Sequence, residues 1–342
     1  MFGLDLGMLK QISQDLNLPA YRAGQIRDWI FKKHAASFSE MSNLPKDVRE
    51  GLAANFSITD STVERVSRDS DTTSKLLVAF PDGSKVEAVV MNYREWSAAC
   101  LSTQVGCAMA CAFCASGPLG RQRNLTAEEM VEQLWHCAAL SAREGLPLRN
   151  IVLMGVGEPL ANLKNVVEFI RLANDPQLFG IGQRRITLST VGLVPAINQL
   201  AREDLAITLA VSLHAPTDQL RNTLIPINRQ RPLKELLAAC RSYTDVTGRR
   251  VTYEYLLLAG INDAPEHARQ LAALLKGHNC LVNLLSYNQV EGLKFKPSRL
   301  VGQFKKILEE MKINVTVRRS LGSGIDAACG QLRRREAEKL GG

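Results

Sequence analysis

Several features that would place this chain in a common class are missing from its sequence. No run of residues approaches the ~18 apolar residues of a membrane-spanning helix, so we expect no membrane segment. No secretory signal, internal repeat or low-complexity tract stands out. The eight cysteines are therefore expected to stay reduced rather than to form structural disulfides. We expect a soluble, cytoplasmic protein.

Basic charge, by contrast, is in excess. The 42 Lys and Arg residues against 34 Asp and Glu residues give a net charge of +8, spread in short clusters along the chain. Such a surface favours a polyanionic partner without requiring one, because much basic surface is simply solvated. The candidate phosphate contacts are basic residues expected in loops or at strand ends near the mouth of the predicted sheet, namely Arg121, Arg123, Arg184, Arg185, Lys294, Lys296, Arg318 and Arg319.

The most informative feature is a group of three cysteines, Cys107, Cys111 and Cys114, in the segment Cys-Ala-Met-Ala-Cys-Ala-Phe-Cys. Three thiolates at this spacing can hold three corners of a [4Fe-4S] cluster. Because full ligation takes four cysteines, one iron then stays open to a substrate. Zinc is an alternative, but its usual sites pair two short Cys or His hooks, and the sequence has no second hook. Buried packing cysteines and a disulfide remain as weaker alternatives.

The hydrophobic pattern predicts an α/β protein. Up to residue 58 the spacing is helical, and Pro81-Asp82-Gly83 then joins two runs of period two into a β-hairpin. Thr126 and Glu129 form a capping box that opens the first helix after the cysteines. From there strands alternate with helices, which predicts a parallel sheet with right-handed crossovers. About six such units predict an open, TIM-like partial (β/α)6 barrel rather than a closed barrel of eight.

These elements have definite expected bounds. The predicted helices are 8–16, 21–34, a segment opened by Pro45, 126–143, 163–173, 194–202, 233–247, 265–275 and 301–311. The predicted strands are 74–80, 84–91, 150–154, 185–190, 206–213, 251–258, 280–287 and 314–318. We divide the chain into a small N-terminal helical module that could contact RNA (1–58), a β-hairpin extension (59–99), the partial barrel (100–332) and a basic C-terminal tail (333–342).

Polar residues stand at the ends of successive predicted strands, where such sheets bind ligands. Gly157 and Glu158 follow the strand that ends at Met154, and glycine there lets the backbone approach a ligand. The third glycine of a dinucleotide-binding Gly-x-Gly-x-x-Gly motif is missing. The other polar strand ends are Ser189, Ser212, His214 and Asn288. One such residue could be a simple cap, but several around one mouth favour a polar ligand.

The remaining cysteines fall into two groups. Cys137, Cys240 and Cys280 fit apolar patterns and are interpreted as packing residues. Cys100 precedes the three-cysteine segment, and Cys329 lies in a glycine-flanked segment after the last predicted strand. Thiols in such positions are candidates for a nucleophilic or redox role.

Together these motifs resemble the RlmN/Cfr family of radical S-adenosylmethionine (SAM) RNA methyltransferases. The resemblance rests on Cys-x-x-x-Cys-x-x-Cys, Gly-Glu-Pro, Ser-Leu-His, a strand-end Asn and Ile-Asp-Ala-Ala-Cys-Gly-Gln-Leu, and it extends to about Leu332. Gly-Val-Gly and Tyr-Asn-Gln depart from the family's usual Gly-Met-Gly and Trp-Asn-Pro without removing a functional group. The resemblance implies a [4Fe-4S] cluster on Cys107, Cys111 and Cys114. The SAM contacts that it implies are Gly157, Glu158, Ser189, Ser212, Leu213, His214 and Asn288.

The resemblance also implies a mechanism with two SAM molecules per turnover. One SAM methylates Cys329, and the second is split at the cluster, so that its deoxyadenosyl radical takes a hydrogen from that methyl group. The resulting radical adds to an adenine of the RNA, and Glu87 is implied as the proton acceptor. Cys100 then attacks the sulfur of Cys329 and releases the methylated RNA, leaving a disulfide for a reductant to open. An electron donor for the cluster is implied as well.

The substrate is the less specific part of the resemblance. Pro159 in Gly-Glu-Pro is more like the RlmN branch, which methylates carbon 2 of adenosine in large-subunit ribosomal RNA and in tRNA. Whether tRNA is a substrate here stays open. The alternatives are carbon-8 methylation of the Cfr type, which confers ribosomal antibiotic resistance, a radical-SAM enzyme acting on a peptide or small molecule, and a non-catalytic metal-stabilised RNA-binding protein. We expect a monomer.

Overall fold

The computed structural model describes residues 19, 21–69, 72–117, 120–318, 322–327 and 330–332. The predicted helix at 8–16, the tail at 333–342, Arg319 and Cys329 lie outside the described residues. Within the described ranges, no helix is both long and apolar enough to cross a membrane.

One mixed sheet forms the frame of the molecule, with strands in the order β1-β2-β3-β4-β7-β8-β9-β10-β11-β12. From β4 onward each strand runs parallel to its neighbour, whereas β1 to β4 pair antiparallel. Its strands are β1 (Thr62–Arg68), β2 (Thr73–Ala79), β3 (Lys85–Asn92), β4 (Ser97–Cys100), β7 (Leu148–Leu153), β8 (Ile186–Thr190), β9 (Thr208–Ser212), β10 (Val251–Leu257), β11 (Cys280–Ser286) and β12 (Val315–Arg318). The predicted partial barrel with a β-hairpin extension is confirmed.

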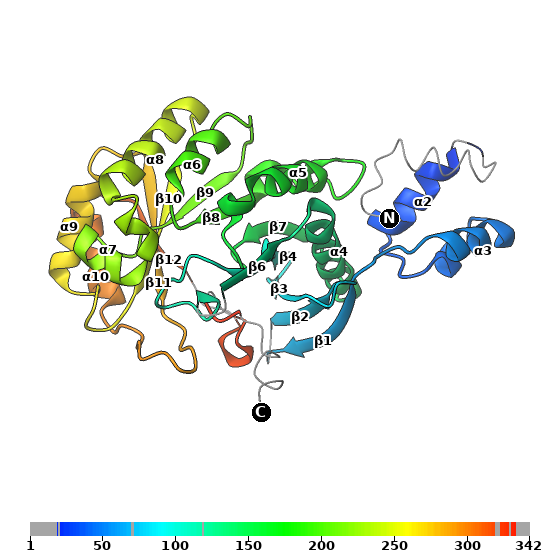
Figure 1. The fold of residues 1–342 in the computed structure, drawn as a ribbon, viewed down its shortest axis with the longest axis horizontal. Coiled ribbons are helices and arrows are strands. Elements are labelled where there is room, and N and C mark those ends of the chain that lie inside the picture. Colours follow the sequence, from blue (N-terminus) through cyan, green and yellow to red (C-terminus); the bar gives the residue numbers. More distant parts are fainter. Residues whose placement is uncertain are drawn as a thin grey trace.

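Helices connect the parallel strands and cover the outer face of the curved sheet (Figure 1). They are α4 (Ala127–Arg143), α5 (Leu163–Asn174), α6 (Val194–Leu200), α7 (Asp218–Leu224), α8 (Leu233–Thr247), α9 (Pro265–Leu275) and α10 (Val301–Glu310). The predicted capping box of α4 is present, since Thr126 accepts from the backbone of Glu129 and the Glu129 side chain accepts from the backbone of Thr126. Local capping chemistry therefore fixes where the first crossover helix begins.

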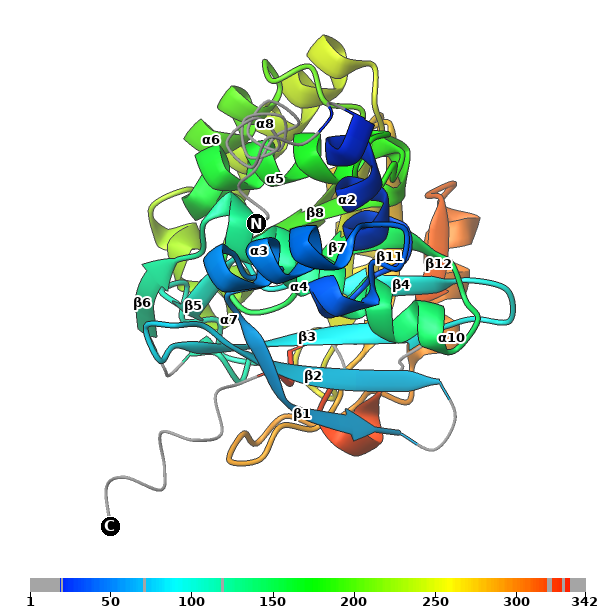
Figure 2. The same cartoon turned by 90° about the vertical axis from the view of Figure 1, so that its right-hand side faces the viewer.

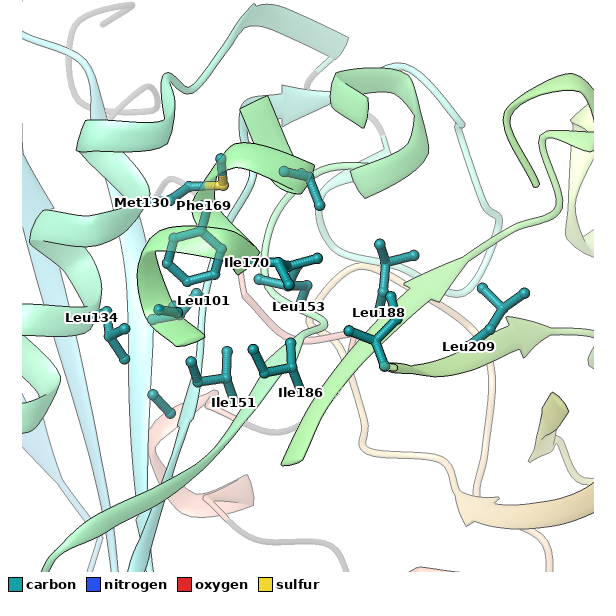
Figure 3. Close-up of a cluster of buried hydrophobic side chains, with 14 of the residues drawn as sticks. Leu101, Met130, Leu134, Ile151, Leu153, Phe169, Ile170, Ile186, Leu188 and Leu209 are labelled. Carbon is teal, nitrogen blue, oxygen red and sulfur yellow. The ribbon is translucent and has the colours of Figure 1, made fainter. Parts of the chain in front are cut away.

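The main core lies between the sheet and these helices. Leu153 of β7 and Leu188 of β8 are completely buried, and Figure 3 shows them facing Phe169 and Ile170 of α5. Burying each such side chain contributes about 1.5–3 kcal/mol. Because one face of the strands is used for this core, the ends of the strands and the opposite face remain for a functional site.

The N-terminal helical module meets α4 at the end of its first helix. Its helices are α2 (Tyr21–Phe31) and α3 (Lys46–Asn55), which Figure 2 shows in front of α4 and the sheet. The indole Nε1 of Trp135 on α4 donates to the backbone oxygen of Ile30, at 2.8 Å. The buried Glu132 carboxylate accepts from the backbone of Asp60 and Ser61, where the chain passes from the helices to β1. The boundaries of the N-terminal module stay a prediction, but its apolar side chains belong to the same core as α4.

Some elements differ from the predicted pattern. β4 already pairs in parallel with β7, so the predicted boundary at residue 100 falls inside this strand. A separate two-stranded sheet, β5 (Gln104–Cys107) and β6 (Gly120–Asn124), flanks the cysteine segment and has no counterpart among the predicted strands. The short helix α7 and the edge strand β1 were not predicted as elements either.

Candidate active site

A pocket opens at the carboxyl ends of the parallel strands, as predicted for this architecture. Most residues predicted to bind the cluster or SAM line it, namely Cys107, Cys111, Cys114, Gly157, Glu158, Ser189, Ser212 and His214. Leu213 is completely buried in the main core, and its backbone N–H donates to the backbone oxygen of Glu254, at 3.0 Å. Asn288 follows β11 and is half-buried. Leu213 and Asn288 are therefore not among the residues that line the pocket.

The cysteine segment is anchored at its start and again just before Cys114. Cys107 closes β5, where Gly106 has a φ of 76° and an added Cβ would lie 2.0 Å from the backbone oxygen of Gly120. Only glycine fits at that bulge. Further along, the backbone N–H of Ala112 donates to the backbone oxygen of Leu224, at 3.0 Å, which ties the segment to the end of α7.

The donor set fits an iron–sulfur cluster. Burial raises the pKa of Cys107 to about 11, and burial together with the neighbouring Cys114 raises the pKa of Cys111 well above its usual value. Without a metal these thiols hold their protons, so metal binding must release them. Within the described ranges, no three Cys, His, Asp or Glu side chains converge on a point that a single ion could occupy. Three thiols that line one pocket instead suit a cluster in which each thiolate binds a different iron.

Glu158 supplies a buried acid beside the thiols. Its carboxylate accepts from the backbone N–H of Leu160, at 3.1 Å, and of Val191, at 2.8 Å. Burial nevertheless raises the pKa of Glu158 to about 7. The preceding Gly157 has a φ of 109°, and a Cβ there would lie 2.7 Å from the side chain of Gln104. This geometry presents a carboxylate that a ligand ammonium group could hold in its ionised form.

His214 is held as a neutral ring in the pocket wall. Its Nδ1 accepts from the backbone N–H of Leu256, at 3.0 Å, and burial lowers the pKa of the imidazole to about 3. The ring packs edge-on against Phe113 of the cysteine segment, with 4.8 Å between ring centroids. The φ of His214 is 56°, a backbone conformation that residues other than glycine adopt rarely. The Ser-Leu-His turn and the cysteine segment are therefore built as one wall.

Arg221 on α7 is the main positioning residue that the sequence did not indicate. It is 1% exposed, and its guanidinium donates to the backbone oxygens of Val191, Ser212 and Leu213, at 2.7–3.1 Å. It also donates to Asn228 at 2.8 Å. Burial lowers its pKa to about 10, so the side chain remains charged at neutral pH. One cation thus fixes the ends of β8 and β9, where the candidate SAM contacts lie.

Replacing Arg221 by Leu is expected to lower the free energy of unfolding by at least about 3 kcal/mol, because it leaves several buried carbonyl oxygens without a donor. The free energy of unfolding of Arg221→Lys should lie between those of the unmodified protein and Arg221→Leu, since an ammonium group cannot reproduce the planar guanidinium. Urea denaturation followed by circular dichroism measures the change. The matched control is Arg231→Leu, an exposed arginine paired with Glu235, where we expect less than about 1 kcal/mol. Equal effects of the two Leu variants would contradict this role of Arg221.

The residues predicted for the later steps lie beside the pocket. Cys100 is the last residue of β4 and is 7% exposed. It packs in a small apolar cluster with Met154, which lines the pocket, and with Ala327 and Leu332, which flank Cys329 in the sequence. Glu87 is buried on β3. Cys329 itself lies outside the described residues, so its role stays a prediction, as do those of Cys100 and Glu87.

Comparisons with known proteins agree on one family. Residues 101–272 match the Radical SAM superfamily model, and residues 1–58 match the model described as the ribosomal RNA large subunit methyltransferase N-terminal domain. A protein of Pelotomaculum thermopropionicum described as "Probable dual-specificity RNA methyltransferase RlmN" is 50% identical over 340 residues, covering 98% of this chain and 91% of that one. A protein of Symbiobacterium thermophilum with the same description is 47% identical over 345 residues, covering 98% and 92%. The crystal structure of a radical SAM methyltransferase from Sphaerobacter thermophilus matches with a TM-score of 0.92 and 44% identity, covering 97% of this chain and 98% of that one.

Proposed function

Because the chain belongs to the RlmN family of radical SAM RNA methyltransferases, we propose that it methylates carbon 2 of a specific adenosine in large-subunit ribosomal RNA. It is an enzyme that uses a [4Fe-4S] cluster and SAM to methylate RNA. The observation that carries the proposal is the pocket in which three thiols meet Glu158 and the polar strand ends. The relatives are described as dual-specificity RNA methyltransferases, which supports a second RNA substrate, and tRNA is the one that we propose.

Different residues of the pocket are proposed to bind the cluster and SAM. When bound, the reduced cluster and SAM supply a carbon-centred radical that can remove a hydrogen atom. Cys107, Cys111 and Cys114 would hold the cluster. Glu158 would accept from the SAM ammonium group, and His214, as a neutral ring, adds no positive charge beside that group. The further SAM contacts that we propose are Gly157, Ser189, Ser212, Leu213 and Asn288.

Two cysteines outside the cluster carry the methyl transfer. We assign Cys329 as the methyl carrier, so that two SAM molecules are used per turnover. Cys100 then attacks the sulfur of Cys329. A disulfide forms as the bond from that sulfur to the transferred carbon breaks, and a thiol reductant must restore both cysteines. The need for this reductant and for an electron donor to the cluster, the monomeric state and the cytoplasmic location stay predictions.

The choice of carbon 2 over carbon 8 rests on the segment after β7. Pro159 lines the pocket and begins a short 3₁₀ helix, and it is the residue that matches the RlmN branch rather than the Cfr branch. Mass spectrometry of RNA digested after anoxic incubation with SAM and a reductant tests the proposal. We expect 2-methyladenosine. 8-Methyladenosine would favour the Cfr-type reaction, and the absence of any methylated adenosine would refute the proposal.

The structure narrows the candidate phosphate contacts. Arg123 is engaged within the protein, since its guanidinium pairs with Asp82 and Glu129, both at 2.7 Å. Arg184 and Arg185 precede β8 and so lie at the amino ends of the strands, away from the pocket. Exposed basic residues on the pocket side are Arg121, Lys294 and Lys296, while Arg318 lines the pocket itself. The expectation that Arg184 and Arg185 lie near the mouth is therefore wrong, because a residue next to a strand in the sequence can lie at either end of the sheet.

RNA binding is expected to weaken steeply with salt, because each phosphate contact releases condensed counterions. The slope of log K against log salt should be about 0.7–0.9 per contact. Neutralising Arg121, Lys294 and Lys296 together to Gln should reduce it by about 2. Filter binding across a salt series measures this, with Arg184→Gln/Arg185→Gln as the control that keeps the slope. A flat slope for the unmodified protein, or equal losses in both variants, would count against this RNA surface.

A further inference from the structure

A buried ion pair lies beside Cys100 in the extension of the sheet. The Nζ of Lys75 on β2 is 2.8 Å from Oε1 of Glu87 on β3, and the two residues are only 8% and 4% exposed. Lys75 pairs across the strands with Val89, and Val89 pairs with Cys100. Glu87 stands two residues before Val89 and therefore projects from the same face. The ion pair and Cys100 thus share one face of the sheet.

The direction of the strands places Glu87 at the edge where the pocket opens. β3 runs antiparallel to β4, so Glu87 lies beyond Cys100, past the carboxyl end of β4. The hydroxyl of Ser102, just after that strand, donates to the backbone oxygen of Glu87, at 2.7 Å. The backbone N–H of Val156, which follows β7, donates to the same hydroxyl, at 2.9 Å. Glu87 is therefore fixed next to the wall of the pocket.

A buried ion pair of this kind has no obvious purpose in stability. Replacing such a pair by apolar residues of similar size is often neutral or stabilising, because desolvation of both charges offsets their attraction. What the cation does change is the charge of its partner. A carboxyl group this deeply buried takes up a proton readily, whereas an ammonium group at hydrogen-bond distance favours the ionised form. Lys75 therefore keeps Glu87 in the form that can accept a proton.

The same ammonium group also holds the C-terminal segment, by which we mean residues 322–327. Lys75 Nζ donates to the backbone oxygen of Asp326, at 3.2 Å. Gly322 has a φ of 75°, and a Cβ there would lie 2.8 Å from Cγ2 of Thr73 on β2 and 2.9 Å from Cβ of Ala327. Figure 1 shows this segment, in red, next to the extension. One side chain thus contacts both Glu87 and the backbone three residues before Cys329.

We propose that Lys75 is a positioning residue for the second half of the reaction. Its ammonium group holds Glu87 ionised and ties the C-terminal segment above it, so that the proton acceptor and the methyl carrier are brought to the same adenine. This inference rests on the proposed function, in which Glu87 accepts the ring proton. In that step the C–H bond of the ring carbon breaks, its electron pair stays with the ring, and the proton converts the Glu87 carboxylate to the acid.

The test compares Lys75→Gln, Lys75→Arg and Glu87→Gln. Gln at position 75 keeps an N–H donor on a side chain one bond shorter and carries no charge, whereas Arg keeps the charge. Three quantities are measured for each variant: methylated Cys329 in the isolated protein by mass spectrometry, covalent protein–RNA adduct on a denaturing gel, and methylated RNA after multiple turnovers. Thermal melting establishes that each variant is folded.

We expect Lys75→Gln to behave like Glu87→Gln. Both should retain methylated Cys329, accumulate the covalent adduct and make at least about 100-fold less methylated RNA, the usual scale of lost acid–base catalysis. Lys75→Arg should recover methylated RNA to within about 10-fold of the unmodified protein. The matched control is Lys85→Gln on β3, whose lysine pairs at 2.8 Å with the more exposed Glu64. This control should turn over normally and form no adduct.

The outcomes separate the inference from the function on which it rests. If Glu87→Gln stalls while Lys75→Gln turns over like Lys85→Gln, the role of Lys75 is overturned and that of Glu87 stands. If Glu87→Gln turns over normally, the proposed proton acceptor is wrong, and the inference is overturned with it. If Lys75→Gln does not fold, the test rests on Lys75→Arg. A folded Lys75→Arg protein that makes no methylated RNA would overturn the inference that the positive charge at this position supports the reaction.

Discussion

Replacing Cys100 by alanine is expected to leave the protein covalently attached to its RNA substrate. Cys100 is proposed to act only after the carbon carried by Cys329 has joined the adenine. All earlier steps should therefore proceed, and the link from Cys329 to the base then has no thiol to break it. A denaturing gel should show one RNA per protein at most, and methylated RNA should fall to background because each enzyme molecule stops after one cycle.

Two further variants serve as controls for Cys100→Ala. Cys329→Ala should form neither methylated protein nor adduct, since it removes the carrier itself. Cys240→Ala removes another buried cysteine, on α8 in the main core, and should turn over without adduct. Normal turnover by Cys100→Ala, or methylated Cys329 without any adduct, would refute the resolving role of Cys100.

Replacing Cys111 by alanine is expected to bleach the protein and abolish all SAM-dependent chemistry. The unmodified protein, purified without oxygen, should be brown and contain iron and sulfide. Loss of one of three thiolates removes a third of the protein ligands of the cluster. We expect iron and acid-labile sulfide near zero and no charge-transfer absorbance in the visible range. The same holds for Cys107→Ala and Cys114→Ala.

The control for the cluster is Cys280→Ala. Cys280 begins β11 at the end of the sheet away from the pocket, so its replacement should leave colour and iron content unchanged. Should the unmodified protein instead carry stoichiometric zinc and no visible absorbance, the cluster and the mechanism built on it would both be wrong.

The elements predicted best are those with strong local signals at both ends. α8 has its predicted bounds, and Gly248 ends it in the left-handed conformation that favours glycine. α9 begins at Pro265, where proline fits the first helical turn. β6, in contrast, reads Gly-Arg-Gln-Arg-Asn and offers no apolar alternation. The edge strand β1 is mostly exposed, so its pattern is equally weak. Such strands exist because of their partners rather than because of their own residues.

The same distinction separates the site residues that the sequence indicated from those it did not. The cysteine spacing and the polar strand ends are local patterns, and the pocket contains most of them. The contacts of Arg221 and Lys75 join segments far apart in the chain, such as Lys75 with Asp326 and Arg221 with Val191. No periodicity or motif encodes these two pairings, because in both of them the cation donates to a backbone oxygen that any residue could provide.

The packing of α2 on α4 restricts how this enzyme could have been assembled from parts. A helix that covers a sheet usually keeps one face polar, but α4 is buried around most of its circumference, Trp135 included. α2 meets α4 where Trp135 donates to the backbone of Ile30, and its Ala23, Ile26 and Ile30 belong to the same core. A barrel expressed without residues 1–58 would expose this apolar surface and is expected to aggregate. Recombination between relatives should therefore exchange the helical module and α4 together, and a relative that has lost the module should show polar replacements on this helix.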